Sequence, residues 1–325
     1  MDTVNLITLA DEEYAMPLAV MVRSLLDHLA AERAIRLVVV DGGITSASKR
    51  RLQESWQGSA GWERCQVGYV TPCYGGARKL PIWGRLTPLT YARLSAAEYL
   101  PAEDGRAILL DPDMLVLTDI GALAGTDLGS AVIAATQDPY IPRLSSVGGL
   151  VNHAALGLRA DDKYFNAGLM VIDMARWRAE RVGPRAFAFI ERHWRTLQQY
   201  DQDSLNAVLA GRWKELNPRW QVQPRAVNSL GLASVDDPFV IHFSGLLKPW
   251  LYRGRTSADA IFYEFLGRTA WRGFRPPRTL GAWAMGLYDS PARRWFHPLE
   301  KRALTLWRRL ARRRVSLPPP PPEAR

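Results

Sequence analysis

The chain has 325 residues, of which 47% are hydrophobic and 23% charged, a balance that excludes a disordered, collagen-like or fibrous protein. Its 42 Lys and Arg against 32 Asp and Glu give a net charge of +10, but the excess is local. Residues 1–250 hold 26 basic and 27 acidic residues, for a net charge of −1, whereas residues 251–325 hold 16 and 5, for a net charge of +11. This separation argues against a nucleic-acid binder whose basic residues cover the whole binding fold.

The first part of the chain alternates between short apolar runs and helical patterns. Apolar runs predict strands over residues 4–9, 35–40 and 66–70. The spacing of apolar residues predicts helices over 17–29 and 46–56, the first of them opened by a proline. Strands that alternate with helices predict βαβ units, and therefore the α/β class with a mostly parallel central sheet covered on both faces.

The middle of the chain continues this alternation. We predict a helix near residues 90–99 and strands over 107–110, 130–135 and 169–172. Residues 137–162 have the Pro, Gly and Ser content of a long loop, and loops of that length in compact domains are usually functional. The remaining predicted elements are helices over 187–197 and 203–210 and a last strand over 239–242.

The composition changes after about Lys248, where Arg, Trp and Pro become frequent and no further strand is predicted. We therefore divide the chain into a catalytic domain over residues 1–250 and a basic, helical C-terminal extension over 251–325. A helix is predicted over Leu299–Val315, with one apolar face and one cationic face, followed by an extended tail at Pro318–Pro322. The apolar face carries Leu299, Ala303, Leu306, Trp307 and Leu310, and the cationic face carries Lys301, Arg302, Arg308, Arg309, Arg312 and Arg313.

A helix with one Leu- and Trp-bearing face and one cationic face is typical of an interfacial membrane anchor. Trp favours the headgroup level, and Arg is attracted to an anionic leaflet. The segment Arg293-Arg294-Trp295-Phe296 forms a second basic and aromatic patch. The alternative is a helix packed on the catalytic domain with a solvated basic face.

Cysteine usage and the first residues indicate the compartment. Cys65 and Cys73 are the two cysteines of the chain, and they have neither metal-type spacing nor the density of a disulfide scaffold. The segment Met1–Asn5 opens no secretory signal pattern, and no apolar run approaches the roughly 18 residues that span a bilayer. We expect a cytoplasmic protein that does not cross the membrane.

Two carboxylates follow a predicted buried strand, at Asp111-Pro112-Asp113. Ligands of open α/β sheets bind outside the carboxyl ends of the strands, so this is where a site is expected. Two carboxylates one residue apart can both reach one hard cation. The alternative for this D-x-D motif is an Asx-type turn.

Three further segments lie at comparable positions. Asn166, Ala167 and Gly168 precede a strand, where small residues allow a ligand to approach the backbone, although a plain turn has the same composition. Asp201-Gln202-Asp203 precedes an apolar helix and has an acidic N-terminal cap as its alternative. His242 follows the last strand and would complete a metal site or be an ordinary core histidine, and Lys248 would hold a phosphate.

In order and wording, six stretches of the chain resemble glycosyltransferase family eight, which includes bacterial lipopolysaccharide galactosyl- and glucosyltransferases and the glycogenins. Between residues 6 and 250, they are LADEEYAMPLAV, TYARLSAAEYL, ILLDPDMLVLTDI, YFNAGLMVIDMARWR, YDQDSLNAVLAGRW and VIHFSGLLKPW. The resemblance implies a GT-A, Rossmann-like fold and transfer of glucose or galactose from a UDP-sugar to a saccharide with retention of anomeric configuration. It also implies that Mn²⁺, or alternatively Mg²⁺, is held by Asp111, Asp113 and His242.

The resemblance assigns the nucleotide side of the donor site to four residues. Asp11 matches an aspartate that contacts uracil and ribose, and Tyr14 is placed to stack on uracil. Lys248 and the Gly245 backbone would hold the diphosphate.

The donor sugar is assigned to a second group of residues. Arg93 matches a residue that reaches the sugar and the diphosphate, with a surface helix arginine as its alternative. Asp201 would contact the sugar hydroxyls, and Gln202 would lie nearest the anomeric carbon on the face opposite UDP. A neutral amide is a poor nucleophile, so we favour attack from the leaving-group face. Asn166, Ala167 and Gly168 would line the sugar pocket.

Two positions depart from the family pattern, one affecting the fine contacts to the uridine and the other the turn between the two aspartates. Glu13 stands where bacterial relatives often have Asn, and Pro112 stiffens the turn between the two aspartates.

The leading hypothesis is a UDP-hexosyltransferase at the inner face of a bacterial membrane. Its acceptor would be a lipid-linked saccharide or lipopolysaccharide, and no nucleic-acid partner is expected. One alternative is a transferase for a soluble or protein-linked acceptor. Another is a non-catalytic GT-A-like protein that binds membrane or nucleic acid.

Overall fold

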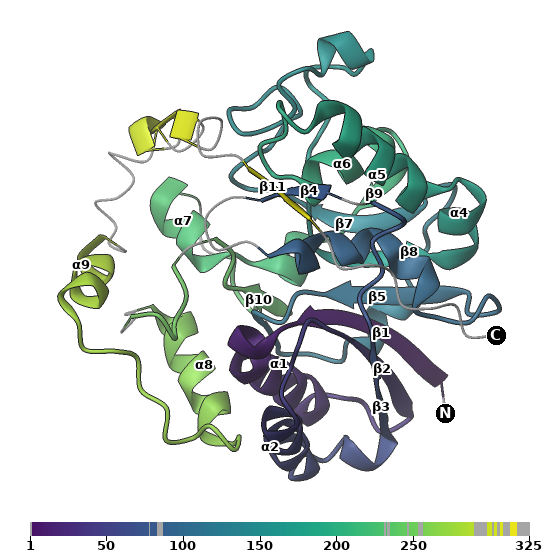
Figure 1. Cartoon of the computed structure of the whole chain (residues 1–325). Coiled ribbons are helices and arrows are strands. Elements are labelled where there is room, and N and C mark those ends of the chain that lie inside the picture. Colours follow the sequence, from purple (N-terminus) through teal and green to yellow (C-terminus); the bar gives the residue numbers. More distant parts are fainter. Residues whose placement is uncertain are drawn as a thin grey trace.

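Seven strands form one central sheet in the order β3-β2-β1-β5-β8-β7-β9, with helices on both of its faces (Figure 1). In this computed structural model the described residues are 2–77, 79–82, 87–230, 232, 235–245, 247–252, 256–288, 298–300, 302–303, 306–307 and 313–316.

The first half of the sheet is parallel, as the sequence predicts. β1 (Asp2–Ala10) pairs in parallel with β2 on one side and with β5 on the other, and β2 pairs in parallel with β3 on its far side. α1 connects β1 to β2, and α2 connects β2 to β3, so two βαβ units follow each other. Their bounds are α1 Ala15–Asp27, β2 Arg33–Asp41, α2 Ser46–Gln57 and β3 Cys65–Val70.

The second half of the sheet contains one reversed strand. β5 (Arg106–Leu110) is parallel to β1, but β8 (Phe165–Asp173) runs antiparallel to both β5 and β7 (Ile133–Gln137). β7 and β9 (Trp213–Glu215) are parallel again. The sheet is therefore mostly parallel, as predicted, and the reversal of β8 is a feature that the apolar pattern did not reveal.

The other described elements lie around this sheet. The helix predicted near residues 90–99 is a 3-10 helix, η3 (Pro88–Glu98), whose backbone departs from helical geometry at Ser95. The remaining elements are η1 Glu12–Tyr14, η2 Trp62–Arg64, β4 Lys79–Ile82, β6 Met114–Val116, α3 Gly121–Ala124, η4 Ala154–Leu156, α4 Met174–Ala179, α5 Val182–His193, α6 Asp201–Val208, η5 Pro218–Gln221, α7 Pro224–Leu230, β10 Val240–His242, α8 Ser257–Gly267, α9 Leu280–Tyr288 and β11 Arg313–Ser316.

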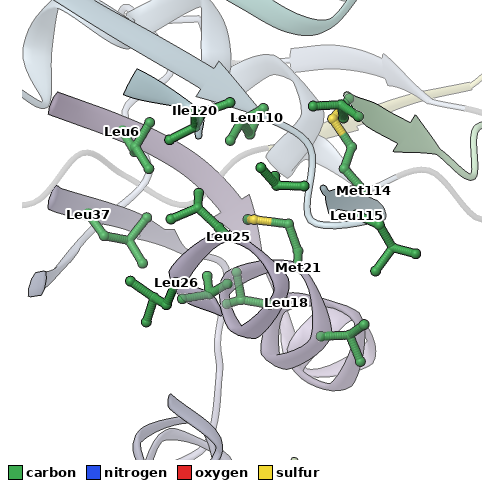
Figure 2. Packing of buried hydrophobic residues seen from close by; sticks show 14 of the residues in the cluster. Leu6, Leu18, Met21, Leu25, Leu26, Leu37, Leu110, Met114, Leu115 and Ile120 are labelled. Carbon is green, nitrogen blue, oxygen red and sulfur yellow. The ribbon is translucent and has the colours of Figure 1, made fainter. Parts of the chain in front are cut away.

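Two hydrophobic clusters cover the two faces of the sheet, because alternate strand residues point to opposite sides. Leu6 belongs to the cluster beneath α1, and its neighbour Ile7 belongs to the cluster on the side of α5 and α6. Figure 2 shows the first cluster, in which Leu18, Met21 and Leu25 of α1 meet strand residues such as Leu6 and Leu110. This rigid layer fixes the carboxyl ends of β1 and β5, where the predicted site lies.

The segment after Lys248 contributes to this core. Phe262 and Leu266 of α8 are almost fully buried and belong to the same cluster as α1, as does Trp271. By contrast, Leu280 and Trp283 of α9 are largely exposed. The division of the chain at residue 250 stays a prediction, and the first elements beyond that residue pack on the sheet-covering helices.

The predicted helix over Leu299–Val315 is correct in part. Residues 298–300, 302–303 and 306–307 are helical, but Arg313–Ser316 forms the strand β11. β11 pairs antiparallel with β4, with Arg313 opposite Ile82 and Ser316 opposite Lys79 (Figure 1). The expectation that no strand follows Lys248 is therefore wrong, because the edge of β4 offers backbone partners that a local helical pattern cannot reveal. The tail at Pro318–Pro322 and the patch at residues 293–296 lie outside the described residues.

Among the described residues, no helix is both long and apolar enough to cross a membrane.

Candidate active site

The two aspartates of the D-x-D motif and His242 meet at the carboxyl end of β5. Asp111 follows the last residue of β5, and its backbone N–H donates to the carbonyl of Gly168 on β8 at 2.8 Å. The chain then enters β6, which pairs antiparallel with β10 so that Met114 lies opposite His242. This short ribbon brings ligand atoms of Asp111, Asp113 and His242 to within 4.8 Å of one another.

The residues of this cluster fit a divalent cation. Asp113 is 5% exposed, and its Oδ1 has no hydrogen-bond partner within the described part of the chain, although Nε2 of His242 lies 3.3 Å away. Nε2 of His242 is 3.8 Å from Oδ2 of Asp111. Carboxylate oxygens with one imidazole suit Mn²⁺ or Mg²⁺, and a buried carboxylate oxygen without a partner is the kind of atom that a cation would satisfy.

The two aspartates of this cluster differ in electrostatics. Burial raises the pKa of Asp111, with Arg93 opposing it. Burial acts in the same direction on Asp113, but the Lys248 ammonium and His242 overcome it and hold the pKa of this carboxyl well below its ordinary value. Nζ of Lys248 donates to Oδ2 of Asp113 and, at 2.6 Å, to the carbonyl of Phe243. Asp113 is therefore a fixed anion at the centre of the site.

Gly168 makes the cluster sterically possible. A Cβ atom at this position would lie 2.6 Å from Cε1 of His242 and 2.8 Å from Oδ2 of Asp111. These separations are far inside van der Waals contact, so the strand β8 passes the carboxylates only because residue 168 has no side chain. The steric need for glycine at residue 168 comes from these neighbouring side chains, whereas the expected approach of a ligand to this backbone stays a prediction.

Arg93 is a buried part of the site, which excludes its alternative as a surface arginine. It is 8% exposed and lies between two carboxylates, with Nη2 2.8 Å from Oδ1 of Asp111 and Nε 2.9 Å from Oδ2 of Asp201. Its Nη1 donates to the carbonyl of Ala167 at 2.7 Å. One guanidinium therefore connects the D-x-D motif, the start of β8 and the start of α6.

Asp201 and Asp203 have separate tasks at the start of α6. Asp203 accepts hydrogen bonds from Tyr164 Oη and from the backbone N–H groups of residues 198 and 199, so it holds the turn that precedes the helix. Asp201 instead faces Arg93 and accepts from the hydroxyl of Thr90 at 3.1 Å. Burial, opposed by Arg93, raises the pKa of Asp201 to about 6. Both aspartates lie in the first turn of α6, whose N-cap residue is Tyr200, so neither is the N-terminal cap that the sequence left as the alternative.

Gln202 is held by two contacts in the same pocket. Its Oε1 accepts from the backbone N–H of Ala167 at 3.0 Å, and its Nε2 donates to Oδ2 of Asp138 at 3.1 Å. The same oxygen of Asp138 accepts from Nδ2 of Asn166 at 2.9 Å. Burial raises the pKa of Asp138, against the hydrogen bonds that it accepts. Asp138 therefore fixes the side-chain amides of both Asn166 and Gln202.

Sequence reasoning missed two buried polar residues of this site, Asp138 and Gln221. Asp138 follows the carboxyl end of β7, as Asp111 follows that of β5, so the same positional rule would have found it. Gln221 ends η5, and its Nε2 lies 2.5 Å from Oδ1 of Asn166 and 2.9 Å from Nδ1 of His242. No motif marks Gln221, because only the folded chain brings it beside His242.

The nucleotide side of the predicted site lies at the end of β1. Oδ1 of Asp11 accepts from the backbone N–H of Tyr14 at 3.2 Å. The ring of Tyr14 meets Trp250 edge to face with centroids 6.0 Å apart, and Nζ of Lys248 lies 6.0 Å from the Tyr14 ring. Gly245 is exposed and has a φ of 77°, in the left-handed region that favours glycine. Tyr14 is thus a neighbour of the aspartate cluster through Lys248, and Asp11 is joined to Tyr14.

Glu12, which follows Asp11 in the first loop, contacts the start of α2, whereas burial and, to a lesser extent, the charge of Glu13 raise the pKa of the Asp11 carboxyl. Both are exposed, and Glu12 accepts from the backbone of Thr45 and the hydroxyl of Ser48, which joins this loop to the start of α2.

Residues 5–254 match the sequence profile described as Glycosyl transferase family 8. The chain belongs to this family. General stress protein A of Bacillus subtilis is 30% identical over 291 residues, which cover 85% of this chain and 97% of that protein. The lipopolysaccharide 1,2-glucosyltransferase of Escherichia coli is 25% identical over 204 residues, or 60% of this chain and 58% of that protein. The resemblance stated from the sequence motifs is therefore confirmed.

Solved structures agree with this assignment. The structure of the galactosyltransferase LgtC in complex with donor and acceptor sugar analogs superposes with a TM-score of 0.70 and 27% identity, over 84% of this chain and 100% of that chain. Mouse xyloside xylosyltransferase 1, at 15% identity and a TM-score of 0.56 over 74% of this chain and 98% of that chain, shares the fold. The predicted α/β, GT-A fold is confirmed. As a member of family 8, the protein is a glycosyltransferase.

Proposed function

We propose that the protein transfers a hexose, glucose or galactose, from a UDP-sugar to a saccharide acceptor with retention of anomeric configuration. The observation that carries this proposal is the cluster of half-buried Asp111 with buried Asp113 and His242 at a strand end, next to Lys248. A cation held there and an ammonium beside it suit the diphosphate of a nucleotide sugar. Family membership, and relatives named as glucosyl- and galactosyltransferases, support the same reaction.

The proposed roles of the site residues follow from their positions. Asp111, Asp113 and His242 would hold Mn²⁺ or Mg²⁺, which when bound supplies Lewis-acid stabilisation of the charge on departing UDP. Lys248 and the Gly245 backbone would bind the diphosphate, while Asp11 and Tyr14 would bind the uridine. All of these residues come from the carboxyl ends of β1, β5 and β10 or from the segments that follow them.

The donor sugar would lie against the second group of residues. Arg93 and Asp201 form a buried ion pair that can orient sugar hydroxyls. The first residues of β8 beside this pair, Asn166, Ala167 and Gly168, would line the sugar pocket. Gln202 is restrained by Ala167 and Asp138, and a neutral amide is a poor nucleophile. We therefore favour attack on the anomeric carbon from the leaving-group face, with Gln202 positioning or stabilising the reacting centre.

We further propose that the acceptor is lipid-linked and that the extension holds the enzyme at an anionic membrane surface. Leu280 of α9 is 86% exposed and Trp283 is 64% exposed, and the side chains of Arg272, Arg275 and Arg278 beside them are exposed as well. Exposed Leu and Trp next to several arginines are typical of an interfacial segment. In Figure 1, α9 lies on the side of the sheet toward which β1 and β5 run, which is also the side of the aspartate cluster.

The proposed reaction is tested by release of UDP from purified protein incubated with UDP-glucose, UDP-galactose and other UDP-sugars. We expect hydrolysis of one or two donors in Mn²⁺ and loss of the signal when a chelator is added. Restoring Mn²⁺ after chelation should restore the signal, which controls for damage by the chelator. Absence of turnover with every UDP-sugar, in either Mn²⁺ or Mg²⁺ and with saccharide acceptors present, would contradict the proposal.

A further inference from the structure

The ammonium of Lys248 is held in place beside the aspartate cluster. Lys248 is 7% exposed, and its Nζ donates to Oδ2 of Asp113 and, at 2.6 Å, to the carbonyl of Phe243. An ammonium carries three protons, and within the described part of the chain these hydrogen bonds use two of them. The third proton can reach a phosphate oxygen only if the backbone of Lys248 is held at the right place.

The helix α8 holds the backbone that follows Lys248. The hydroxyl of Tyr263, on α8, donates to the carbonyl of Pro249, the residue after Lys248, at 2.6 Å. The ring of Trp250 lies against the ring of Phe262, with centroids 5.4 Å apart and planes inclined by 31°. Both of these rings are buried. Two successive residues of α8 therefore fix the two residues that come directly after Lys248.

A buried ion pair anchors the N-terminus of α8. Thr256 and Asp259 form a capping box, and Oδ1 of Asp259 also accepts from Nη2 of Arg225 at 2.8 Å. Arg225 and Asp259 are both buried, and separating such a pair is costly because each charge would lose its partner in the interior. α8 is therefore held firmly on the rest of the chain, although its residues 257–267 lie beyond the residues 5–254 that match the family profile.

We infer that Tyr263 is a positioning residue that sets Lys248 for the diphosphate of the donor, so that the extension takes part in nucleotide binding. The inference rests on the proposed role of Lys248 and adds to it a residue that no family motif marks. Without the Tyr263 hydroxyl, the carbonyl of Pro249 loses this donor and the backbone beside Lys248 can shift. A shift of about an ångström would take the ammonium out of hydrogen-bond reach of a phosphate oxygen, because charge-assisted hydrogen bonds are only about 2.7–2.9 Å long.

The test compares UDP with uridine, which differ by the diphosphate that Lys248 would hold. The full-length Tyr263→Phe variant removes one oxygen atom and keeps the ring. We expect its Kd for UDP in Mn²⁺ to rise about tenfold, while its Kd for uridine stays within about twofold of the parent value. Displacement of a fluorescent UDP derivative by each unlabelled ligand measures both constants. A general loss of structure would instead weaken the binding of both ligands.

A double-mutant cycle shows whether Tyr263 acts through Lys248. Lys248→Met removes the ammonium and should raise the Kd for UDP by more than Tyr263→Phe does. In the Lys248→Met background, Tyr263→Phe should have no further effect on UDP binding, because the group that it positions is gone. Equal effects of Tyr263→Phe in both backgrounds would mean that the two residues act independently, and the inference would be wrong. If Lys248→Met does not fold, the ratio of the UDP and uridine constants in Tyr263→Phe decides alone.

The matched control is Tyr69→Phe, which also removes one phenolic oxygen. Tyr69 lies on β3, is 36% exposed and has no assigned role in the site. Tyr69→Phe should bind UDP and uridine as the parent chain does, and thermal unfolding of each variant shows whether the fold is retained. Unchanged UDP binding by Tyr263→Phe, or an equal loss in Tyr69→Phe, would overturn the inference.

The outcomes for the two proposals are distinguishable. If the parent chain binds no UDP, the proposed donor site fails and the role of Tyr263 falls with it. If Lys248→Met binds UDP as tightly as the parent chain, the diphosphate role of Lys248 is wrong, and so is the inference built on it. If Lys248→Met binds UDP more weakly and Tyr263→Phe does not, only the positioning role of Tyr263 is wrong.

Discussion

Arginine side chains have different surroundings and different interactions in the two parts of this chain. Arg93, in the part with a net charge of −1, is 8% exposed and is fixed between Asp111 and Asp201. The arginines around α9, in the part with a net charge of +11, are exposed. A buried, paired guanidinium acts over a few ångströms and resists screening, whereas exposed cations act over about a Debye length and weaken in salt. Net charge alone therefore says little about where a charged side chain matters.

The comparison predicts that substitutions in the first part change turnover and leave membrane binding intact, and that substitutions of exposed residues in the extension do the reverse. The expected effects are largest at the cation cluster and smallest at the exposed surface.

Replacing Asp113 should have the largest effect on turnover. Asp113→Asn removes an anion from the cation cluster, and loss of several kcal/mol of Lewis-acid stabilisation corresponds to about a 10³-fold lower rate. UDP release from UDP-hexose in Mn²⁺ measures this loss. Asp127→Asn, which changes an exposed aspartate, is the matched control. Retention of most of the rate in Asp113→Asn would show that the cluster is not needed for the reaction.

Adding one methyl group at Gly168 should have the next largest effect. The Cβ of Gly168→Ala would lie 2.6 Å from the His242 ring, so the ring or β8 must move. Displacement of catalytic groups by about an ångström can cost about 100-fold in rate. Gly68→Ala on β3, where a Cβ meets no atom within 4 Å, should leave the rate unchanged. Equal rates for Gly168→Ala and the parent chain would mean that the site tolerates the shift.

The pH dependence of the rate should carry the signature of Asp201, whose pKa burial raises to about 6. As the pH falls through about 6, its carboxylate gains a proton and the ion pair with Arg93 weakens. We expect the rate of UDP release to fall up to about tenfold for each pH unit below this value. Asp201→Asn should be slower at neutral pH and should lack this limb of the profile. The same limb in both proteins would assign it to another group.

The same pKa shift also affects stability, which should fall as the pH rises, whereas the rate should fall as the pH falls. Because the pKa of Asp201 is higher in the folded chain than its ordinary value of 3.8, the folded state holds an extra proton between about pH 4 and pH 6. Its contribution to the free energy of unfolding therefore declines as the pH rises through this window. Urea unfolding on either side of the window should show a flatter pH dependence for Asp201→Asn.

The smallest expected effects come from the exposed surface of the extension. The double substitution of Leu280 and Trp283 by Ser should weaken binding to vesicles that contain phosphatidylglycerol by roughly tenfold, because it removes apolar surface that would enter the interface. The free energy of unfolding should change by less than about 1 kcal/mol, since both side chains are exposed. Co-sedimentation measures binding, and vesicles of phosphatidylcholine alone show the charge dependence.

Val151→Ser, at an exposed apolar position far along the chain from α9, serves as the matched control for vesicle binding. Undiminished binding by the Leu280 and Trp283 variant would remove α9 from the membrane contact. Deletion of residues 298–325 is a less selective test of the same proposal, because it also removes β11, the strand that pairs with β4.

Much of the fold could be predicted from the sequence because the first strands and helices have strong local patterns. β1, α1 and β2 bury nearly continuous apolar runs or one clear helical face, and Asp111 follows such a run directly. The direction of β8 could not be predicted, because an apolar run has the same composition whether its neighbours are parallel or antiparallel. The strand β11 was missed because its stability comes from pairing with β4 and not from its own residues.

The candidate site was predictable where a motif carries the chemistry and unpredictable where only the fold does. Asp111, Asp113 and His242 were expected together from family motifs, and the structure brings them together. Asp138 and Gln221 have no such motif, because the role of a buried amide or carboxylate depends on neighbours that only the tertiary structure brings to it. A rule based on the position after each strand end finds Asp138, but it does not find Gln221.

The pairing of β4 with β11 has a consequence for how the chain acquires its structure. β4 lies in the first third of the chain, and β11 follows every other described element. During synthesis, β4 therefore emerges long before the strand that pairs with it, and its backbone groups stay available until β11 has been made. An open strand edge is a template for pairing with another chain. The ribbon can therefore close only after β11 has been made, and a chain that lacks β11 leaves this edge of β4 open to pairing with another chain.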